Sequence, residues 1–211
     1  MKKLLSFFWP QTKTIMSDHN GLLELTYVNG KKILDSKNAN YSYGSLQKIM
    51  RKGLSHVDFS KIDKVLVLGL GGGCVIKELQ KYNTKLTAVE WDKVVLDIAK
   101  VEFRIEENSH LKLVCADAYA YLLANQEVFD FVIVDLFVDD KVPTQFFQES
   151  FCKLILKTIG DQGQILFNLG LHQTLDVFRG VQCFFDQNNC ETQMLHKVQK
   201  TNSLLLVKKM G

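Results

Sequence analysis

Short apolar runs alternate with helical periodicity along most of the chain. The run KVLVLGL (Lys64–Leu70) is continuously apolar, as expected for a strand buried in a parallel sheet. Comparable runs predict further strands at Lys85–Trp91, at Phe129–Phe137 and at Gly163–Gly170, and another strand that ends near Cys115. Segments with apolar positions three and four residues apart separate them. This alternation indicates right-handed βαβ units, with helices covering both faces of one sheet.

The helical segments carry plausible boundary residues. Asp92 can cap a helix over residues 93–103, and a further helix can begin at Asp117. Pro143 can open a helix that runs to residue 159, because proline is tolerated in a first turn. Residues 174–188 predict an amphipathic helix with an apolar side made of Leu175, Phe178, Val181 and Phe185.

The two ends of the chain follow other patterns. Residues 21–36 predict a β-hairpin, in which Asn29-Gly30 supplies the two positive φ angles of a type I′ turn. Residues 41–54 then predict a helix with one apolar stripe. The last twenty residues predict two strands around Lys200-Thr201-Asn202. We therefore expect an α/β fold with a mainly parallel sheet, a C-terminal antiparallel strand pair and a small N-terminal unit of hairpin plus helix.

The predicted organisation has two parts, a short unit over residues 1–58 and an α/β domain over residues 59–211. The net charge of +3 over 211 residues is too small to argue for nucleic acid as a partner. No run approaches the roughly 18 apolar residues of a membrane span. Leu4–Trp9 is too short for a signal peptide, and we expect it to be a docking segment.

The five cysteines are odd in number and include no CxxC pair, which argues against a disulfide framework and against a zinc site. This usage is typical of the reducing cytoplasm, where we expect the protein to be found.

A glycine loop follows the first predicted strand of the sheet. In an open parallel sheet, ligands bind beyond the carboxyl ends of the strands, and bare backbone there permits close approach. Gly69, Gly71 and Gly73 satisfy the spacing G-x-G-x-G, which is typical of S-adenosylmethionine-type ligands. The dinucleotide spacing G-x-G-x-x-G would need glycine where Cys74 stands. A dehydrogenase is therefore the weaker interpretation.

Acidic residues end the strands beside this loop. Glu90 lies 21 residues after Gly69, where a carboxylate can accept hydrogen bonds from both ribose hydroxyls. Asp117 follows the third strand and can meet an adenine amino group, cap a helix, or do both. Asp135 ends the fourth strand, and further acids follow in DLFVDDKVP. Together they favour a nucleoside-type ligand.

These segments resemble the spermidine synthases, or polyamine aminopropyltransferases, and their relatives. The resemblance covers roughly residues 20–170 and rests on the N-terminal hairpin and on VLVLGLGGG, TAVEWDKVVLDIAK, LVCADAYAYL and FDFVIVDLFVDDKVP. It implies a class I methyltransferase-like, Rossmann-type sandwich that binds S-adenosylmethionine or decarboxylated S-adenosylmethionine.

The resemblance also implies roles for individual residues. Glu90 corresponds to the acid that binds ribose, and Asp117 to the acid that contacts adenine. Asp135 corresponds to the acid that takes a proton from the attacking amine, with Asp139 or Asp140 assisting. On the acceptor side, Tyr43 and Asp140 would contact the substrate. No metal is implied.

The chain departs from the family pattern in three places. Family members carry an Asp where Gly72 stands, a His-Glu pair where Gly44-Ser45 stands, and a small polar segment where Leu136 and Phe137 stand. We therefore expect methyl transfer to an unidentified small acceptor, of which an amine is one candidate. Aminopropyl transfer to a polyamine, and a non-catalytic ligand-binding or scaffold role, stay open. The edge of the N-terminal hairpin could pair two chains in a homodimer.

Overall fold

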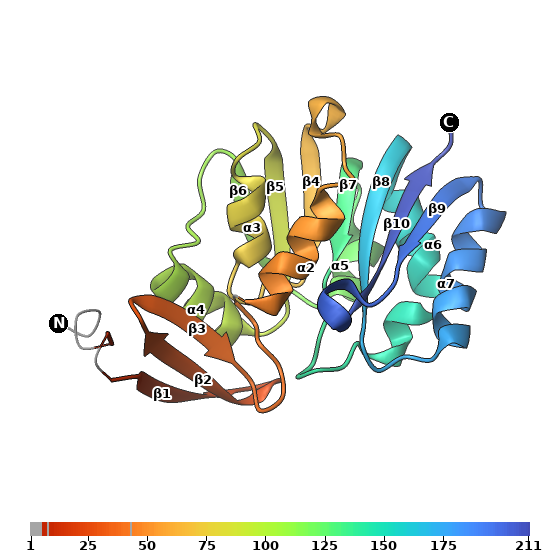
Figure 1. The fold of residues 1–211 in the computed structure, drawn as a ribbon. Helices are drawn as coiled ribbons and strands as arrows, with labels where there is room; N and C mark the ends of the chain where they lie inside the picture. Colours follow the sequence, from red (N-terminus) through yellow and green to blue (C-terminus); the bar gives the residue numbers. More distant parts are fainter. Residues whose placement is uncertain (1–5, 8, 43) are drawn as a thin grey trace.

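The computed structural model describes residues 6–7, 9–42 and 44–211. They form two sheets (Figure 1). The larger sheet has the order β6-β5-β4-β7-β8-β10-β9. Its strands are β4 (Lys64–Leu68), β5 (Lys85–Glu90), β6 (Leu111–Cys115), β7 (Phe129–Val134), β8 (Ile159–Gly170), β9 (Cys190–Leu195) and β10 (Ser203–Lys209).

The pairing within this sheet follows the prediction. β4 pairs in parallel with both β5 and β7, and β6 and β8 extend the parallel part on either side. β10 pairs antiparallel with β8 and β9. The expected α/β class, the mainly parallel sheet and the antiparallel C-terminal pair are thus confirmed.

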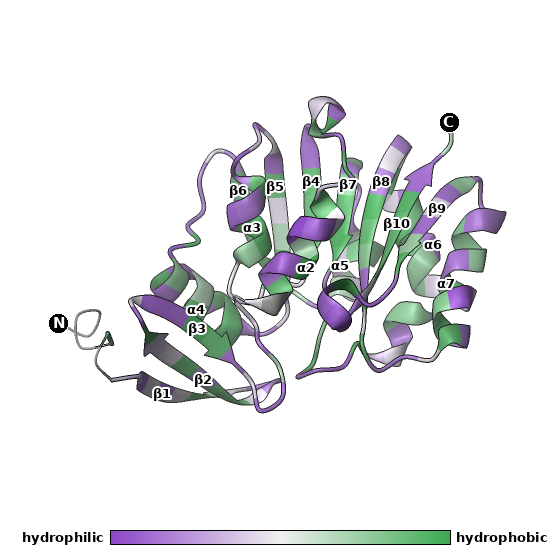
Figure 2. Ribbon diagram, in the orientation of Figure 1, coloured by the Kyte–Doolittle hydropathy of each residue, from purple (hydrophilic) through white to green (hydrophobic). Residues whose placement is uncertain are grey.

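Helices cover both faces of the sheet (Figure 1). One layer contains α2 (Ser45–Leu54), α3 (Cys74–Leu79) and α4 (Lys93–Phe103), and the other contains α5 (Ala118–Ala124), α6 (Glu149–Thr158) and α7 (Leu175–Gln187). Successive strand side chains point to opposite layers, so Val65 and Val67 join the first core while Leu66 and Leu68 join the second. In Figure 2 the central strands β4, β7 and β8 are accordingly coloured as hydrophobic over much of their length, with polar residues near their ends.

The N-terminal unit contains more strand than the sequence predicted. Its sheet has three strands, β1 (Gln11–Ser17), β2 (Gly21–Val28) and β3 (Lys31–Asp35), in that order. The hairpin and its turn are confirmed, since Asn29 and Gly30 have φ of 50° and 72°. The additional strand β1 pairs along its whole length with β2. Three of the six residues of the predicted docking segment Leu4–Trp9, namely Leu4, Leu5 and Phe8, lie outside the described residues.

Among the predicted boundaries that were wrong, two lie between β7 and β8. Pro143 opens only a short 3-10 helix, η2 (Thr144–Phe147), because Gln148 is extended with ψ of 148° and α6 begins after it. β8 begins at Ile159, four residues earlier than predicted.

Leu175 was expected on the apolar side of α7 but is 59% exposed. It is the first residue of that helix, ahead of the buried positions Phe178 and Val181.

Both predicted caps are present. The Asp92 side chain accepts hydrogen bonds from the N–H groups of Val94 and Val95 at the start of α4, and Asp117 accepts one from Ala120 at the start of α5. No helix in the described part of the chain is long and apolar enough to cross a bilayer. The described side chains also include no cluster of three His, Cys, Asp or Glu suited to a metal ion.

Candidate active site

A cavity of about 380 Å3 lies where the parallel strands end. Its volume is within the range of small-molecule sites, roughly 300–1,000 Å3. The residues after β4, β5 and β6 form one half, which contains the glycine loop, Glu90 and Asp117. The residues after β7 and β8 form the other half, together with the β9–β10 turn and the segment before α2. Asp135 lies between the two halves, at the end of the central strand β7.

The glycine loop is held between neighbouring backbone segments. A Cβ atom at Gly69 would lie 2.2 Å from the carbonyl oxygen of Asp135, and one at Gly71 would lie 2.7 Å from that of Tyr41. Gly69 and Gly71 line the cavity. Gly73 is buried against Ile105 and starts α3 with φ of 74°. The glycines therefore allow the loop to approach Asp135 and the segment before α2 closely.

The carboxylate of Glu90 holds this loop through hydrogen bonds to its backbone. One of its carboxylate oxygens accepts hydrogen bonds from the N–H groups of Leu70 (3.0 Å) and Gly71 (3.2 Å). The other accepts from the N–H of Asp92 at 3.1 Å. Burial raises the pKa of Glu90, and these three backbone donors oppose that rise. Glu90 lines the cavity and also holds the backbone of the loop.

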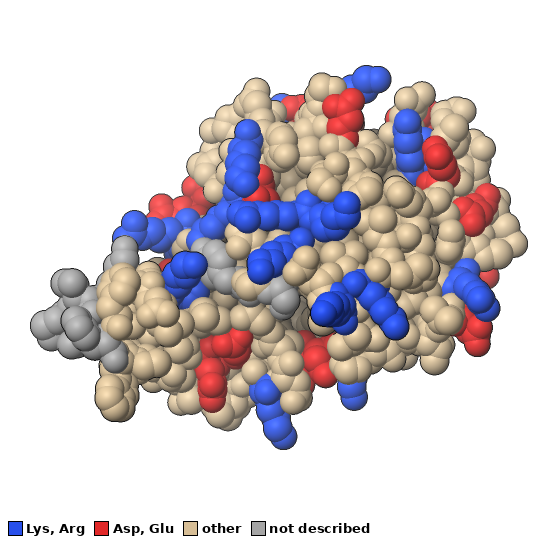
Figure 3. Space-filling view, viewed as in Figure 1, with Lys and Arg blue, Asp and Glu red and all other residues tan. Residues whose placement is uncertain are grey.

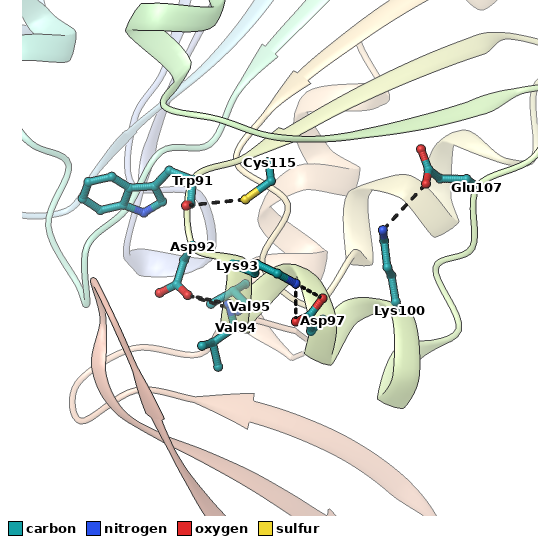
Figure 4. Close-up of polar contacts among 9 residues, drawn as sticks. All are labelled: Trp91, Asp92, Lys93, Val94, Val95, Asp97, Lys100, Glu107 and Cys115. Carbon is teal, nitrogen blue, oxygen red and sulfur yellow. Dashed lines mark hydrogen bonds and ion pairs between the residues drawn. The ribbon is translucent and has the colours of Figure 1, made fainter.

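The residues after Glu90 join the N-terminal sheet to the cavity. Asp92 receives hydrogen bonds from Ser17, at the end of β1, and from the amide of Asn20, in the β1–β2 turn. His19 of the same turn stacks on the Trp91 indole with ring centroids 4.1 Å apart. Figure 4 shows Asp92 at the start of α4 and the Trp91 side chain extending away from that helix. Trp91 and Asn20 both line the cavity, so the N-terminal sheet supplies part of its wall.

Asp117 lines the same half of the cavity as Glu90. One of its oxygens accepts a hydrogen bond from the Ala120 N–H at 2.9 Å. Asp117 can therefore cap α5 with that oxygen and contact a ligand with the other.

Asp135 is held by a short chain of amide side chains. Its Oδ1 accepts a hydrogen bond of 2.8 Å from the amide nitrogen of Asn168, which is fully buried at the end of β8. The Asn168 oxygen in turn accepts from the Asn202 amide at 3.0 Å and from the Gly170 N–H at 3.2 Å. Because both donors meet that oxygen, the Asn168 nitrogen must face Asp135.

The electrostatic surroundings of Asp135 suit a base. Burial raises its pKa to about 6; the Asn168 hydrogen bond opposes the rise, and the charge of Glu90 adds to it. An acid with this pKa is ionised at neutral pH yet basic enough to accept a proton from a bound amine. The geometry therefore offers a carboxylate that can deprotonate an acceptor at the boundary between the two halves of the cavity.

Asp139 lies in an acidic turn, which we define as Val138–Lys141, closed by hydrogen bonds between its two end residues. Its Oδ1 accepts from Ser36 Oγ (2.6 Å) and the Asn38 N–H (3.0 Å), and its Oδ2 accepts from the Asn38 amide (2.5 Å). Burial alone would raise its pKa, but the hydrogen bonds from Ser36 and Asn38 bring it below the usual range. Asp139 thus ties the acidic turn to the N-terminal unit.

Asp140, the next residue of the acidic turn, contacts the opposite side. Its Oδ2 lies 2.8 Å from Nε2 of His172, in the loop that follows β8. Both residues line the cavity. Tyr43, the other predicted substrate contact, lies outside the described residues.

Several residues of the site had no sequence signal. Asn168, Asn202, Asn20 and Ser36 are ordinary polar residues whose partners lie far away in the chain. Trp91 could have been noted because it follows the predicted ribose acid directly. The carboxylates that line the cavity are Glu90, Asp117, Asp135, Asp139 and Asp140, whereas no Lys or Arg of the described chain lines it.

Comparison with known proteins identifies the family of this chain. The family model for the spermine/spermidine synthase domain matches residues 47–177. That range contains the glycine loop, Glu90, Asp117 and the acidic turn.

Individual relatives fall into two groups. A polyamine aminopropyltransferase of Sulfurisphaera tokodaii is 32% identical over 125 residues, covering 54% of this chain and 41% of that protein. An eEF1A lysine and N-terminal methyltransferase homolog of Drosophila melanogaster is 28% identical over 169 residues, covering 70% of this chain and 24% of that protein. The chain thus spans less than half the length of these relatives.

A solved structure extends the likeness to the fold. Human methyltransferase-like protein 13, determined in complex with SAH, superposes with a TM-score of 0.65 at 19% identity, covering 80% of this chain and 83% of that one. The fold is therefore that of the class I methyltransferases. With the family model matching well over half of its residues, the chain belongs to the spermine/spermidine synthase family, whose members are S-adenosylmethionine-type transferases.

Proposed function

We propose that the protein transfers a methyl group from S-adenosylmethionine to an amine nitrogen. Gly69 and Gly71 would border the donor, Glu90 would bind its ribose and Asp117 its adenine. These assignments are supported by the position of all four residues in one half of the cavity. The Drosophila relative, named as a lysine and N-terminal methyltransferase homolog, supports an amine as acceptor.

The observation that carries the choice of donor is the packing at Gly72. Aminopropyl transfer moves a chain that ends in an ammonium, and that ammonium needs a partner when it leaves water. Synthases place an Asp in the glycine loop at this point. Here a Cβ at position 72 would lie 2.5 Å from the Cβ of Ser42, and the Gly72 N–H donates to the Tyr41 carbonyl at 2.7 Å. The loop has neither that carboxylate nor room for it.

Asp135 would act at the acceptor. An ammonium has no lone pair, so the amine must lose a proton before its nitrogen attacks the methyl carbon. The Asp135 carboxylate would accept that proton and hold the nitrogen in line with the carbon–sulfur bond. Attack then forms the nitrogen–carbon bond as the sulfur departs with the bonding electrons as a neutral thioether. Positioning supplies much of the rate in such a displacement.

Aminopropyl transfer from decarboxylated S-adenosylmethionine is the second candidate. It is favoured by a cavity lined with carboxylates and by the activity named for the Sulfurisphaera relative. Both donors share the adenosyl group. The two candidates therefore differ in the chain attached to the donor sulfur, which the glycine loop must accommodate.

Calorimetric titration with the two donors tests the proposal. We expect S-adenosylmethionine to bind at least tenfold more tightly than its decarboxylated form. The reverse order would contradict the proposed donor and favour aminopropyl transfer instead. If neither donor binds, the chain is a non-catalytic member of the family. NADH serves as the negative control, because Cys74 replaces the third glycine of the dinucleotide motif.

A further inference from the structure

We propose that a positively charged face beside the cavity docks an acidic segment of a polypeptide, and that this segment carries the acceptor amine. This basic face is defined by Lys48 and Lys52 of α2 and by Lys197 and Lys200 of the β9–β10 turn, residues 196–202. Docking on this face is independent of the reaction. That the docked amine is the acceptor rests on the transfer proposed above and specifies its substrate class.

The lysines of the basic face carry charges that no described residue neutralises. All four are exposed, and their side chains form no ion pair or hydrogen bond with any residue that the structure describes. The helix α2 packs against η3 (Val198–Lys200), so its two lysines and those of the turn share one surface. Figure 3 shows Lys and Arg side chains gathered over α2 and the β9–β10 turn. Unpaired charges gathered in this way attract a partner with several negative charges.

The β9–β10 turn holds two of these lysines in an unfavourable backbone conformation. Lys197, Gln199 and Lys200 have φ of 48°, 54° and 64°, although none of them is glycine. The left-handed region crowds any residue with a Cβ atom, and conformations of this kind cluster at functional sites. Packing within the protein does not explain them here, because all three residues are exposed. We therefore attribute the shape of the turn to the presentation of its two lysines to a partner.

Both elements of the basic face also contribute to the cavity. The helix α2 supplies Leu46 and Ile49 to the cavity wall, and the turn supplies Thr201 and Asn202, which directly follow Lys200. The lysines themselves are not among the residues that line the cavity. A segment docked on the basic face therefore lies beside the cavity rather than in it.

The β9–β10 turn further connects the basic face to the proposed base. The amide of Asn202 donates to Asn168, whose amide donates to Asp135. Lys200 precedes Asn202 by two residues, which an extended chain spans in about 7 Å. A polypeptide bound at Lys200 is therefore only a few residues away from Asp135, and an amine on a neighbouring side chain can reach this carboxylate.

Charge complementarity explains why the docked segment carries an amine. Carboxylates line the cavity, among them Asp135 and Asp140, so the cavity attracts an ammonium group. The basic face beside it attracts carboxylates. A polypeptide segment with one amine among several acidic side chains matches both surfaces at once, with the amine in the cavity and the acids outside it.

The composition of the basic face favours a polypeptide over a nucleic acid. Residues 45–54 and 196–202 contain no Phe, Tyr or Trp on which bases could stack. They contain a single arginine, Arg51, whose guanidinium lies 2.6 Å from the Glu78 carboxylate. The forked donor that suits phosphates and bases is therefore already engaged. The remaining cations are lysines, whose compact charges pair with the carboxylates of Asp and Glu side chains.

The first test measures docking by fluorescence anisotropy. The probe is a fluorescein-labelled peptide of one lysine flanked by glutamates, and the reference is the same peptide with glutamine in place of every glutamate. We expect the glutamate peptide to bind at least tenfold more tightly in about 50 mM NaCl, and to lose at least fivefold in affinity in about 300 mM NaCl, where charges are screened. Equal binding of the two peptides, or tighter binding of a labelled oligouridylate of the same charge, overturns the proposal.

Matched variants locate the docking surface. Lys197→Asn with Lys200→Asn removes two charges, and asparagine tolerates the left-handed backbone at both positions. This double variant should bind the glutamate peptide at least fivefold more weakly. Lys112→Asn with Lys157→Asn is the control, because both lysines are exposed on other elements, β6 and α6, and it should weaken binding less than twofold. Equal losses in the two double variants would show that only the net charge acts.

The helix offers a variant that does not depend on the turn. Lys48→Ala with Lys52→Ala keeps α2 intact, because alanine favours a helix, and should also weaken binding of the glutamate peptide at least fivefold. Retained binding in this variant contradicts docking on the basic face, even where the turn variant has lost binding by misfolding.

The two proposals fail separately. If the donor titration favours decarboxylated S-adenosylmethionine, methyl transfer is wrong, yet the peptide comparison still decides whether the basic face docks an acidic segment. If S-adenosylmethionine binds but mass spectrometry finds no methyl group on the lysine of the docked glutamate peptide, the acceptor is not an amine of this class. Where the methyl group is found, the turn variant should raise the KM for this peptide at least fivefold and leave kcat unchanged.

Discussion

At the scale of single residues, Asp135 links function to a cost in stability. Its pKa is about 6 in the folded chain against an ordinary value of 3.8. Between these pH values the unfolded chain ionises at this position while the folded chain does not. The free energy of unfolding should therefore fall as the pH rises from about 4 to about 6, by up to about 3 kcal/mol. Urea denaturation of Asp135→Asn across this range should show that this contribution to the slope is lost.

The same variant tests the role of Asp135 in catalysis. Asp135→Asn should lower turnover by about 10²- to 10⁴-fold, because the amide cannot accept the acceptor proton. Donor affinity should change less than threefold. In the wild-type protein, turnover should rise with pH through about 6 as Asp135 ionises. Steady-state rates measure turnover and its pH dependence, and calorimetry measures the donor affinity.

Asp161→Asn is the control for this variant, because Asp161 is 87% exposed and, among the residues that the structure describes, forms an ion pair with Lys209 alone. Asp161→Asn should leave turnover and donor affinity unchanged. Retention of full turnover by Asp135→Asn would exclude Asp135 as the base.

How far single residues could be predicted depends on what fixes their positions. Glu90 and Asp135 were predictable because each directly follows an apolar run, and parallel strands end at one edge of the sheet. Asn168 was not predictable as a partner of Asp135, since its contact depends on the register between β7 and β8. The hydrogen bonds to the Asp139 carboxylate were not predictable either, because their donors lie in the loop after β3, about a hundred residues away in sequence.

At the scale of elements, the acidic turn connects parts of the chain that share no sheet. Asp139 has φ of 55°, a left-handed conformation in which Asp and Asn are more tolerated than most residues. From this position its carboxylate reaches Ser36 and Asn38 beyond β3, while Asp140 reaches His172 beyond β8. The turn therefore joins the N-terminal unit to the acceptor half of the cavity.

Removing this connection should destabilise the protein. Asp139→Ala deletes three hydrogen bonds and places a side chain without polar atoms at a positive φ. We expect the free energy of unfolding to drop by about 1–3 kcal/mol, measured by urea denaturation at pH 7. Lys141→Ala, at an exposed position of the same turn, should change it by less than about 0.5 kcal/mol. Equal effects of the two substitutions would show that the Asp139 contacts add nothing.

Element boundaries were harder to predict than element types. The strand β1 carries mixed polar residues, and only its pairing with β2 identifies it. The segment after Pro143 has helical periodicity throughout, so the interruption at Gln148 left no mark in the sequence. Tertiary contacts decided both cases, whereas the continuous apolar runs of β4 and β7 were sufficient alone.

At the scale of the whole molecule, donor binding should couple to global stability. A ligand that binds only the folded chain adds about 2.7 kcal/mol at one hundred times its Kd, which raises the Tm of a chain this size by roughly 5–10 °C. We expect such a rise with S-adenosylhomocysteine in differential scanning calorimetry.

Glu90→Ala should abolish most of that rise. The substitution also leaves three backbone N–H groups without their acceptor, so the variant melts lower even without ligand. The ligand-induced change in Tm, rather than Tm itself, is therefore the quantity to compare. A full shift in Glu90→Ala would rule out Glu90 as a ribose contact.

The overall sheet was predictable because its pattern repeats, but the placement of the N-terminal sheet was not. Nothing in the alternation of residues 21–36 indicates that the β1–β2 turn lies against Trp91 and Asp92. Such contacts join surfaces between units, where residues are partly polar and carry no periodic signal.

The position of β10 between β8 and β9 has a consequence for biosynthesis. The ribosome releases β8 and β9 first, so the edge of β8 stays unpaired until residues 203–209 emerge. The glycine loop and Glu90 precede that point by more than a hundred residues and Asp117 by almost ninety, so the nascent chain can assemble the donor half early. Asn168 gains its partner Asn202 only near the end of translation. The nascent protein thus carries an open strand edge, prone to aggregation, for as long as its acceptor half is incomplete.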